Sequence, residues 1–123
     1  MEQTTETTYV KAYQDEHFTI DFELRTAEVD GVKLVLTYKE YELLALLVRR
    51  AGEVVPREAL LHDVWGYGPE IRTRTLDVHV LRLRRKIGQH AERYIETIFG
   101  LGYRFQPFAA PRFDAKWFTN RAA

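Results

Sequence analysis

The run from Arg72 to Ile87 holds the side chains best suited to binding another molecule. It contains six basic residues against a single acidic residue, Asp77. An α-helix advances about 100° per residue. One helix face then carries an apolar stripe of Leu76, Val80, Leu83 and Ile87, and the opposite face carries Arg74, Val78, Leu81, Arg82 and Arg85. Because guanidinium groups bind phosphates and guanine edges, the pattern predicts a helix that lies in a DNA groove.

A solvated amphipathic helix is the alternative interpretation of the same pattern. Such a face usually mixes acidic with basic residues, and it does not usually expose apolar side chains such as Val78 and Leu81. A thymine methyl group or a partner surface would accept both side chains. The composition of this face therefore favours contact with nucleic acid.

The overall composition gives no such signal, because 18 basic residues balance 18 acidic residues. Residues 1–30 hold eight acidic and two basic residues, so the basic charge lies downstream. The absence of cysteine excludes disulfides, thiolate nucleophiles and cysteine-based zinc sites. We find no nucleophile–base pair and no metal-ligand spacing around His17, His62, His79 or His90, and we expect neither an enzyme nor a cofactor.

The chain length of 123 residues suits one domain. We expect residues 1–16 to be a partly disordered N-terminal segment, with residues 1–8 poorly ordered. Residues 17–106 would form the folded domain, and residues 107–123 an aromatic C-terminal extension that packs on the domain, binds a partner or is disordered. The start lacks a signal peptide and the longest aliphatic run, 43–48, is too short to span a membrane. We therefore expect a cytoplasmic protein with no membrane partner.

The periodicity predicts a small antiparallel sheet before three helices. Apolar residues alternate in 18–22 and 32–36 around a hairpin signal at Asp30-Gly31. Thr37 and Glu40 form a capping box for a helix over 38–50, for which Gly52 is the natural stop. Pro56 starts a second helix that ends at Gly66, and the basic helix follows at about 73–87.

Two strands, 94–99 and 103–105, follow the basic helix and are joined by a turn containing Gly100 and Gly102. A nucleotide-binding loop would need a third glycine and a following helix, which are missing. The predicted fold class is thus α+β: a winged helix-turn-helix with an N-terminal antiparallel sheet, three helices and a C-terminal hairpin wing. In this arrangement the basic helix enters the major groove and the hairpin contacts adjacent backbone or the minor groove.

The chain resembles the output domain of OmpR/PhoB-type response regulators over about residues 18–105. The motifs that carry the resemblance are Arg57-Glu58-Ala59-Leu60-Leu61, Val64-Trp65-Gly66, Arg74-Thr75-Leu76-Asp77-Val78-His79-Val80, Arg82-Leu83-Arg84 and Gly100-Leu101-Gly102-Tyr103-Arg104-Phe105. The resemblance implies a sequence-specific, double-stranded DNA-binding domain that controls transcription in a two-component system. It implies a monomer that pairs on direct repeats of DNA, with a receiver domain and a sensor kinase as partners in a longer protein.

Site roles follow from the resemblance, residue by residue. Base contacts are implied for Asp77, Val78 and Arg82. Phosphate contacts are implied for Trp65, Arg74, Thr75, His79, Arg84, Arg85, Thr97 and Tyr103. The loop Gly66, Tyr67, Gly68, Pro69, Glu70, Ile71 and Arg72 is a candidate contact for RNA polymerase. For Trp65 the alternative is core packing, and for His79 it is a histidine at the boundary of the buried stripe.

Several features depart from the family pattern. Phe99 replaces an arginine that commonly enters the minor groove from the wing turn, and Leu81 replaces a basic or polar residue. Phe99 would pack inward or wedge against sugars. No receiver domain fits in 123 residues, so the chain is either an excised output domain or a protein that lacks one. A winged-helix module that binds protein and no DNA is the alternative function.

Overall fold

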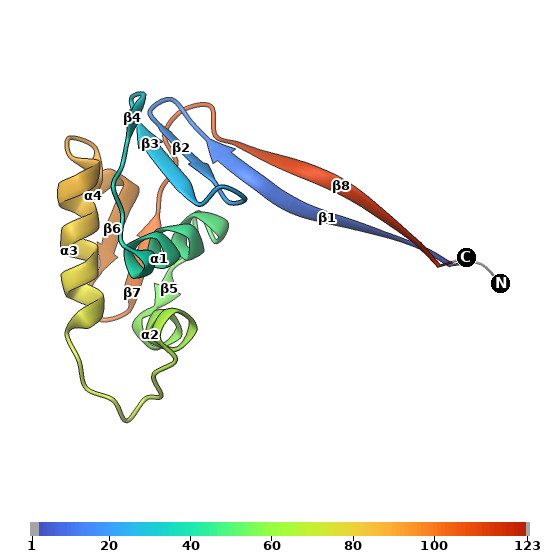
Figure 1. The fold of residues 1–123 in the computed structure, drawn as a ribbon. Helices are drawn as coiled ribbons and strands as arrows, with labels where there is room; N and C mark the ends of the chain where they lie inside the picture. The colour runs from blue at the N-terminus through green and yellow to red at the C-terminus, as the bar shows by residue number, and fades with distance from the viewer. Residues whose placement is uncertain (1–2, 123) are drawn as a thin grey trace.

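The computed structural model describes the backbone of residues 3–122 and the side chains of residues 10–114 (Figure 1). Its elements are β1 (Gln3–Gln14), β2 (Phe18–Asp21), β3 (Thr26–Val29), β4 (Val32–Lys33), α1 (Tyr38–Arg49), β5 (Val55–Pro56), α2 (Arg57–Trp65), α3 (Thr75–Ile87), α4 (Ala91–Tyr94), β6 (Ile95–Ile98), β7 (Gly102–Phe105) and β8 (Arg112–Ala122). This architecture confirms the predicted α+β winged-helix class and adds a fourth, short helix, α4.

The N-terminal sheet is antiparallel, with strand order β4-β3-β2-β1-β8. β1 and β8 leave the body together as a long antiparallel pair that places Gln3 opposite Ala122 (Figure 1). Residues 1–8 were expected to be poorly ordered. The structure instead pairs residues 3–8 with residues 117–122 of β8, beginning with Gln3↔Ala122. Met1 and Glu2 lie outside the described residues, as do the side chains of Trp117 and Phe118.

The predicted strand over 32–36 is wrong beyond its first two residues. The turn at Asp30-Gly31 does form, with φ of 48° and 79°, and it joins β3 to β4. Val32 is 68% exposed, and the chain leaves the sheet after Lys33. The strand that pairs with β2 is instead β3. Its two buried residues are too few to stand out in the sequence.

Helix α1 lies at the centre of the core, with both predicted capping bonds present. Glu40 N–H donates to Thr37 Oγ1 over 3.2 Å, and Thr37 N–H donates to Glu40 Oε1 over 2.9 Å. The helix ends at Arg49, three residues before Gly52. Its fully buried leucines pack among the larger core residues of the other elements, which include Phe18, Leu60, Leu76, Leu83 and Phe105.

The core also reaches beyond the range 17–106. The buried carboxylate of Asp15 accepts hydrogen bonds of 2.6 Å from the hydroxyls of Tyr13 and Tyr94, and one of 3.1 Å from Phe108 N–H. Burial alone would raise the pKa of Asp15, but the hydrogen bonds outweigh it and hold that pKa below its usual range. Phe108 packs on the Tyr94 ring, so part of the C-terminal extension covers its own domain.

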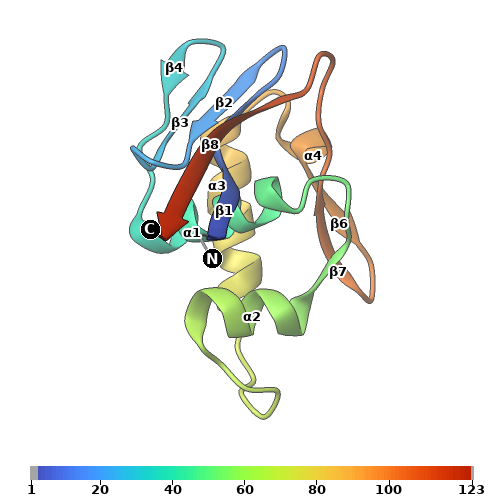
Figure 2. The same ribbon diagram turned by 90° about the vertical axis from the view of Figure 1, so that its right-hand side faces the viewer.

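Helices α2 and α3 and the hairpin β6–β7 form the remainder of the winged helix (Figure 2). As predicted, α2 ends at Gly66, and this glycine adopts the left-handed conformation that commonly terminates helices, with φ of 74°. The short strand β5 pairs with β7 and anchors the hairpin to the start of α2. No helix in the described part of the chain is long and apolar enough to cross a membrane.

Candidate nucleic-acid interface

Helix α3 is buried on the predicted face and exposed on the other. Leu76, Val80, Leu83 and Ile87 are buried, which confirms the stripe. Val78 and Leu81 are 39% and 48% exposed, and the outward arginines are exposed as well. Two apolar side chains therefore lie among cations on a surface that the fold leaves open.

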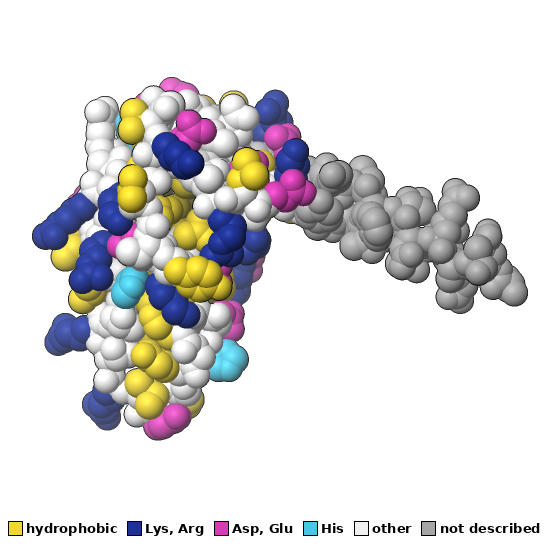
Figure 3. Space-filling view, in the orientation of Figure 1, with side chains coloured by type: hydrophobic (Ala, Val, Ile, Leu, Met, Phe, Trp, Pro, Cys, Tyr) yellow, Lys and Arg dark blue, Asp and Glu magenta, His cyan; other side chains and the backbone are white. Residues whose placement is uncertain are grey.

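The basic residues of this region fall into two groups. Lys86 binds the buried Glu40 carboxylate over 2.5 Å, and Arg84 donates to Ile95 O over 2.6 Å and to Thr97 Oγ1 over 2.7 Å. Among the basic residues from Arg72 to Lys86, those that are exposed and form no ion pair are Arg72, Arg74, Arg82 and Arg85. Figure 3 shows basic side chains along the edge of the molecule that α3 forms.

Asp77, a predicted base contact, faces the chain's own residues. Arg57 donates to both of its carboxylate oxygens over 2.6 and 3.0 Å, and the Tyr103 hydroxyl donates over 2.6 Å. The bond from Arg57, more than that from Tyr103, holds the pKa of Asp77 below its usual range. Burial, and then the bond to Asp77, raises the pKa of Tyr103. These three side chains join α2, α3 and the wing.

Trp65 and His79 form a second contact between α2 and α3. Their rings meet edge to face at 4.9 Å, and Trp65 packs against the core. His79 Nδ1 lies 2.7 Å from Thr75 O and 3.3 Å from Thr75 Oγ1. The geometry matches the packing alternatives for both rings and places the half-buried Thr75 at the first turn of α3.

The wing turn presents a large apolar side chain to solvent. Phe99 is 90% exposed and Leu101 is 60% exposed, so Phe99 does not pack inward. Gly100 has φ of 78° at the tip. A Cβ at Gly102 would clash with the carbonyl oxygen of Val55. Gly102 therefore permits the close pairing of β5 with β7, on which the position of the wing depends.

The loop 66–72 borders an open pocket beside α2. The pocket is also lined by Arg57, Glu58 and Asp77, and the loop contains a turn in which Ile71 N–H donates to Gly68 O over 3.1 Å. Tyr67 and Ile71 are 36% and 43% exposed. The loop thus offers both apolar and charged side chains at one end of α3.

The structure brings Val78, Arg82 and Arg85 onto one open face, while Asp77, Arg84, Thr97 and Tyr103 make contacts within the chain. Neither the role of Arg57 nor the partner of Glu40 is apparent from the sequence. Both contacts join residues at least 20 positions apart. No local motif signals such pairs, because they depend on how the helices pack.

Comparison with known proteins identifies the family to which this chain belongs. The family model described as "Transcriptional regulatory protein, C terminal" matches residues 31–105, more than half of the chain. The response regulator DrrB of Thermotoga maritima, described as an OmpR/PhoB homologue, superposes with a TM-score of 0.70 at 35% identity, covering 78% of this chain and 44% of that one. The chain is an OmpR/PhoB-type transcriptional regulatory domain.

Other relatives agree with this assignment. The DNA-binding domain of Klebsiella pneumoniae RstA, solved in complex with the RstA box, matches this OmpR/PhoB-type domain with a TM-score of 0.73 at 30% identity, covering 80% of this chain and 99% of that one. The transcriptional regulatory protein ResD of Bacillus subtilis is 41% identical over 93 residues, which is 73% of this chain and 39% of ResD. The chain spans about two fifths of the curated relatives that it matches.

Proposed function

We propose that this chain binds double-stranded DNA in a sequence-specific manner and thereby controls transcription, as the output domain of a response regulator. The observation that carries the proposal is α3, whose apolar stripe is buried while arginines and two apolar side chains face outward. RstA, which shares the fold, was crystallised with its DNA box through the corresponding domain. We assign α3 to the major groove.

Arg82 and Val78 are the proposed base contacts. Arg82 can donate to a guanine edge, and Val78 can contact a thymine methyl group. Arg74, Thr75 and Arg85 would hold phosphates, because they lie on or beside the same open face. Asp77 would affect base recognition only by holding α3 in position, since both of its carboxylate oxygens already accept hydrogen bonds from Arg57 and one of them also accepts a hydrogen bond from Tyr103.

The other residues that were predicted to contact phosphates would instead support the interface indirectly. Arg84 with Thr97, and Asp77 with Tyr103, hold the wing against α3. Trp65 and His79 keep α2 against α3. The exposed Phe99 would contact sugars in the neighbouring minor groove, where apolar wedges are common.

The partners are proposed from family membership. Two copies would occupy a direct repeat, and a receiver domain, controlled by a sensor kinase in the cytoplasm, would regulate them. The loop 66–72 would contact RNA polymerase, and its exposed Tyr67 and Ile71 support that role. The chain would have no catalytic activity.

Selection from random duplexes, with binding followed by fluorescence anisotropy at several salt concentrations, tests the proposal. We expect an enriched direct repeat and a log–log salt slope of roughly −3 to −6, as about four to six phosphate contacts require. Arg82→Ala should lose roughly 1–3 kcal/mol on the selected site. The control is Arg50→Ala, which removes the same charge from the end of α1, where Arg50 pairs with Glu53.

Two outcomes would contradict the proposal. Absence of binding at low salt, with the fold intact, would favour a protein-binding module. Equal losses for Arg82→Ala and Arg50→Ala would mean that only general charge attracts the DNA and that α3 reads no bases.

A further inference from the structure

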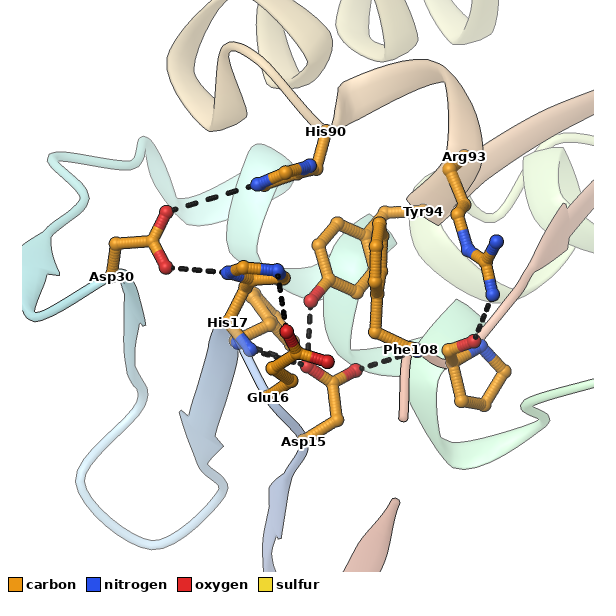
Figure 4. A network of polar contacts seen from close by, with 10 residues as sticks. Asp15, Glu16, His17, Asp30, His90, Arg93, Tyr94 and Phe108 are labelled. Atoms are coloured by element: carbon orange, nitrogen blue, oxygen red, sulfur yellow. Dashed lines mark hydrogen bonds and ion pairs between the residues drawn. The ribbon is translucent and has the colours of Figure 1, made fainter. Parts of the chain in front are cut away.

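Three chain segments far apart in sequence place two histidines and a carboxylate together, on the N-terminal sheet side of the domain (Figure 4). His17 directly precedes β2, Asp30 lies in the turn between β3 and β4, and His90 precedes α4. One nitrogen from each ring and one carboxylate oxygen all lie within 4.8 Å of one another. No spacing in the sequence reveals this group, because the fold alone assembles it.

The two imidazoles present nitrogens to the same carboxylate. Their rings stack at 4.1 Å with an angle of 25°. His17 Nδ1 lies 2.7 Å from Asp30 Oδ1, whereas His90 Nε2 lies 3.9 Å from Asp30 Oδ2, beyond hydrogen-bonding distance. The Asp30 carboxylate thus lies within hydrogen-bonding distance of only one of the two ring nitrogens. A cation located between the two rings and the carboxylate could bind all three groups.

We propose that His17, Asp30 and His90 form a binding site for a divalent transition metal such as Zn²⁺. Two imidazoles and a carboxylate are a donor set that Zn²⁺ accepts, with a water at the fourth position, whereas Mg²⁺ and Ca²⁺ prefer oxygen ligands. Around a tetrahedral zinc, ligand atoms stand roughly 3.3 Å apart. The 2.7 Å pair of His17 and Asp30 must therefore separate slightly and the wider pairs must close, and Asp30, with a side chain 55% exposed, has room to move.

The surroundings already hold the ligands in place. Glu16 Oε1 lies 3.4 Å from His17 Nε2, where a carboxylate commonly orients a metal-binding histidine through its second nitrogen. Asp15 accepts a hydrogen bond from His17 N–H over 3.0 Å. Phe108 packs edge-on against His17 and His90 at 5.0 and 4.9 Å. The two rings are 22% and 17% exposed and the Asp30 side chain is 55% exposed, so solvent reaches the site mainly at Asp30.

A bound ion would join the N-terminal sheet to the segment between α3 and α4. That segment directly follows the helix proposed to read DNA. None of the three proposed ligands is a proposed DNA contact, although His90 borders the same surface pocket as Leu81 and Arg85. Zn²⁺ binding can therefore be measured without DNA.

The site is tested by titrating the metal-free chain, without a histidine tag, with Zn²⁺ in the presence of a competing chromophoric chelator. We expect one Zn²⁺ per chain, no competition by Mg²⁺, and a higher melting temperature with Zn²⁺. The variants His17→Gln, His90→Gln and Asp30→Asn should each weaken Zn²⁺ binding at least tenfold. Asn also adopts positive φ, so the last variant removes the charge and retains the turn.

His62→Gln is the matched control. His62 also lies beside a carboxylate, 3.1 Å from Asp63, but no second histidine joins it. Zn²⁺ binding should be unchanged in this variant. In NMR spectra of the ring nitrogens, Zn²⁺ should shift the signals of His17 and His90 and leave His62 and His79 unmoved. No binding by the wild-type chain, or equal affinity in all variants that retain the native fold, would overturn the proposal.

Discussion

The charged residues on α3 form two groups, one that contacts other parts of the chain and one that faces solvent. Arg84, Lys86 and Asp77 face their own chain, where each meets a specific partner on another element. Arg82 and Arg85 face outward. Sequence alone placed all five on one basic helix, yet only packing decides which charges remain available to a ligand.

Replacing Asp77 with Asn tests its role as a support. The change weakens the bonds from Arg57 and Tyr103, and we expect the free energy of unfolding to fall by about 1–2 kcal/mol. Urea denaturation of Asp77→Asn, Arg57→Gln and the double variant forms a cycle. A coupling of roughly 0.5–3 kcal/mol is expected for residues in direct contact. Additive losses would mean that the pair does not stabilise the fold.

The exposure of Val78, Arg82 and Arg85 could be anticipated from helical period alone, because exposure on a helix follows position. The contacts of Asp77, Tyr103 and Arg84 within the chain could not. Their partners lie on elements that become neighbours only when the wing folds back onto α3.

Buried polar contacts join the elements to one another in addition to the apolar core. Glu40 is 1% exposed and joins the start of α1 to the end of α3 through Lys86. Burial alone would raise the pKa of Glu40, but the bonds from Lys86 and Thr37 outweigh it and hold the pKa below its usual range. The contact therefore depends on pH in a defined direction.

A carboxyl whose pKa is lower in the folded state adds stability above its unfolded pKa, about 4.3 for Glu. That stability is lost as pH falls through the folded pKa. Glu40→Gln should therefore cost on the order of 1–2 kcal/mol at pH 7. Its difference from wild type should shrink below pH 4. Denaturation at pH 7, 4 and 3 checks this, with the more exposed Glu53→Gln as control. A constant difference would refute the assignment.

The wing depends on the close approach of β5 to β7. In Gly102→Ala the new Cβ would clash with the Val55 carbonyl, and we expect a loss of at least about 2 kcal/mol. Gly100→Ala has open space and only an unfavourable φ of 78°, and it should cost about 1 kcal/mol. Thermal unfolding of both variants measures the contrast. A smaller loss for Gly102→Ala would show that the pairing is dispensable.

The elements best predicted from sequence are those with strong local signals. Helix α1 has its capping box, and α3 has its apolar stripe. β3, β5 and α4 are 4, 2 and 4 residues long, so each leaves little periodic pattern. β8 was missed for another reason: its partner is at the opposite end of the chain.

The whole molecule separates its charges although their sum is zero. Acidic residues predominate in the first thirty residues, which supply β1, β2 and β3 of the N-terminal sheet, and exposed arginines lie on α3. Net charge therefore supplies no general attraction to DNA, and the local potential at α3 orients the encounter. This separation was visible in the sequence, but its assignment to different sides of the molecule required the fold.

The paired strands β1 and β8 also determine how the domain responds to force. Gln3 and Ala122 lie at the same tip of an antiparallel ladder (Figure 1), whose hydrogen bonds run perpendicular to the strands. Tension that separates the ends would load one rung at a time, beginning near Gln3↔Ala122. β1 and β8 would separate pair by pair toward Gln14 before any load reached the bonds of Asp15, so this ladder insulates α3 from tension that pulls the two strands apart.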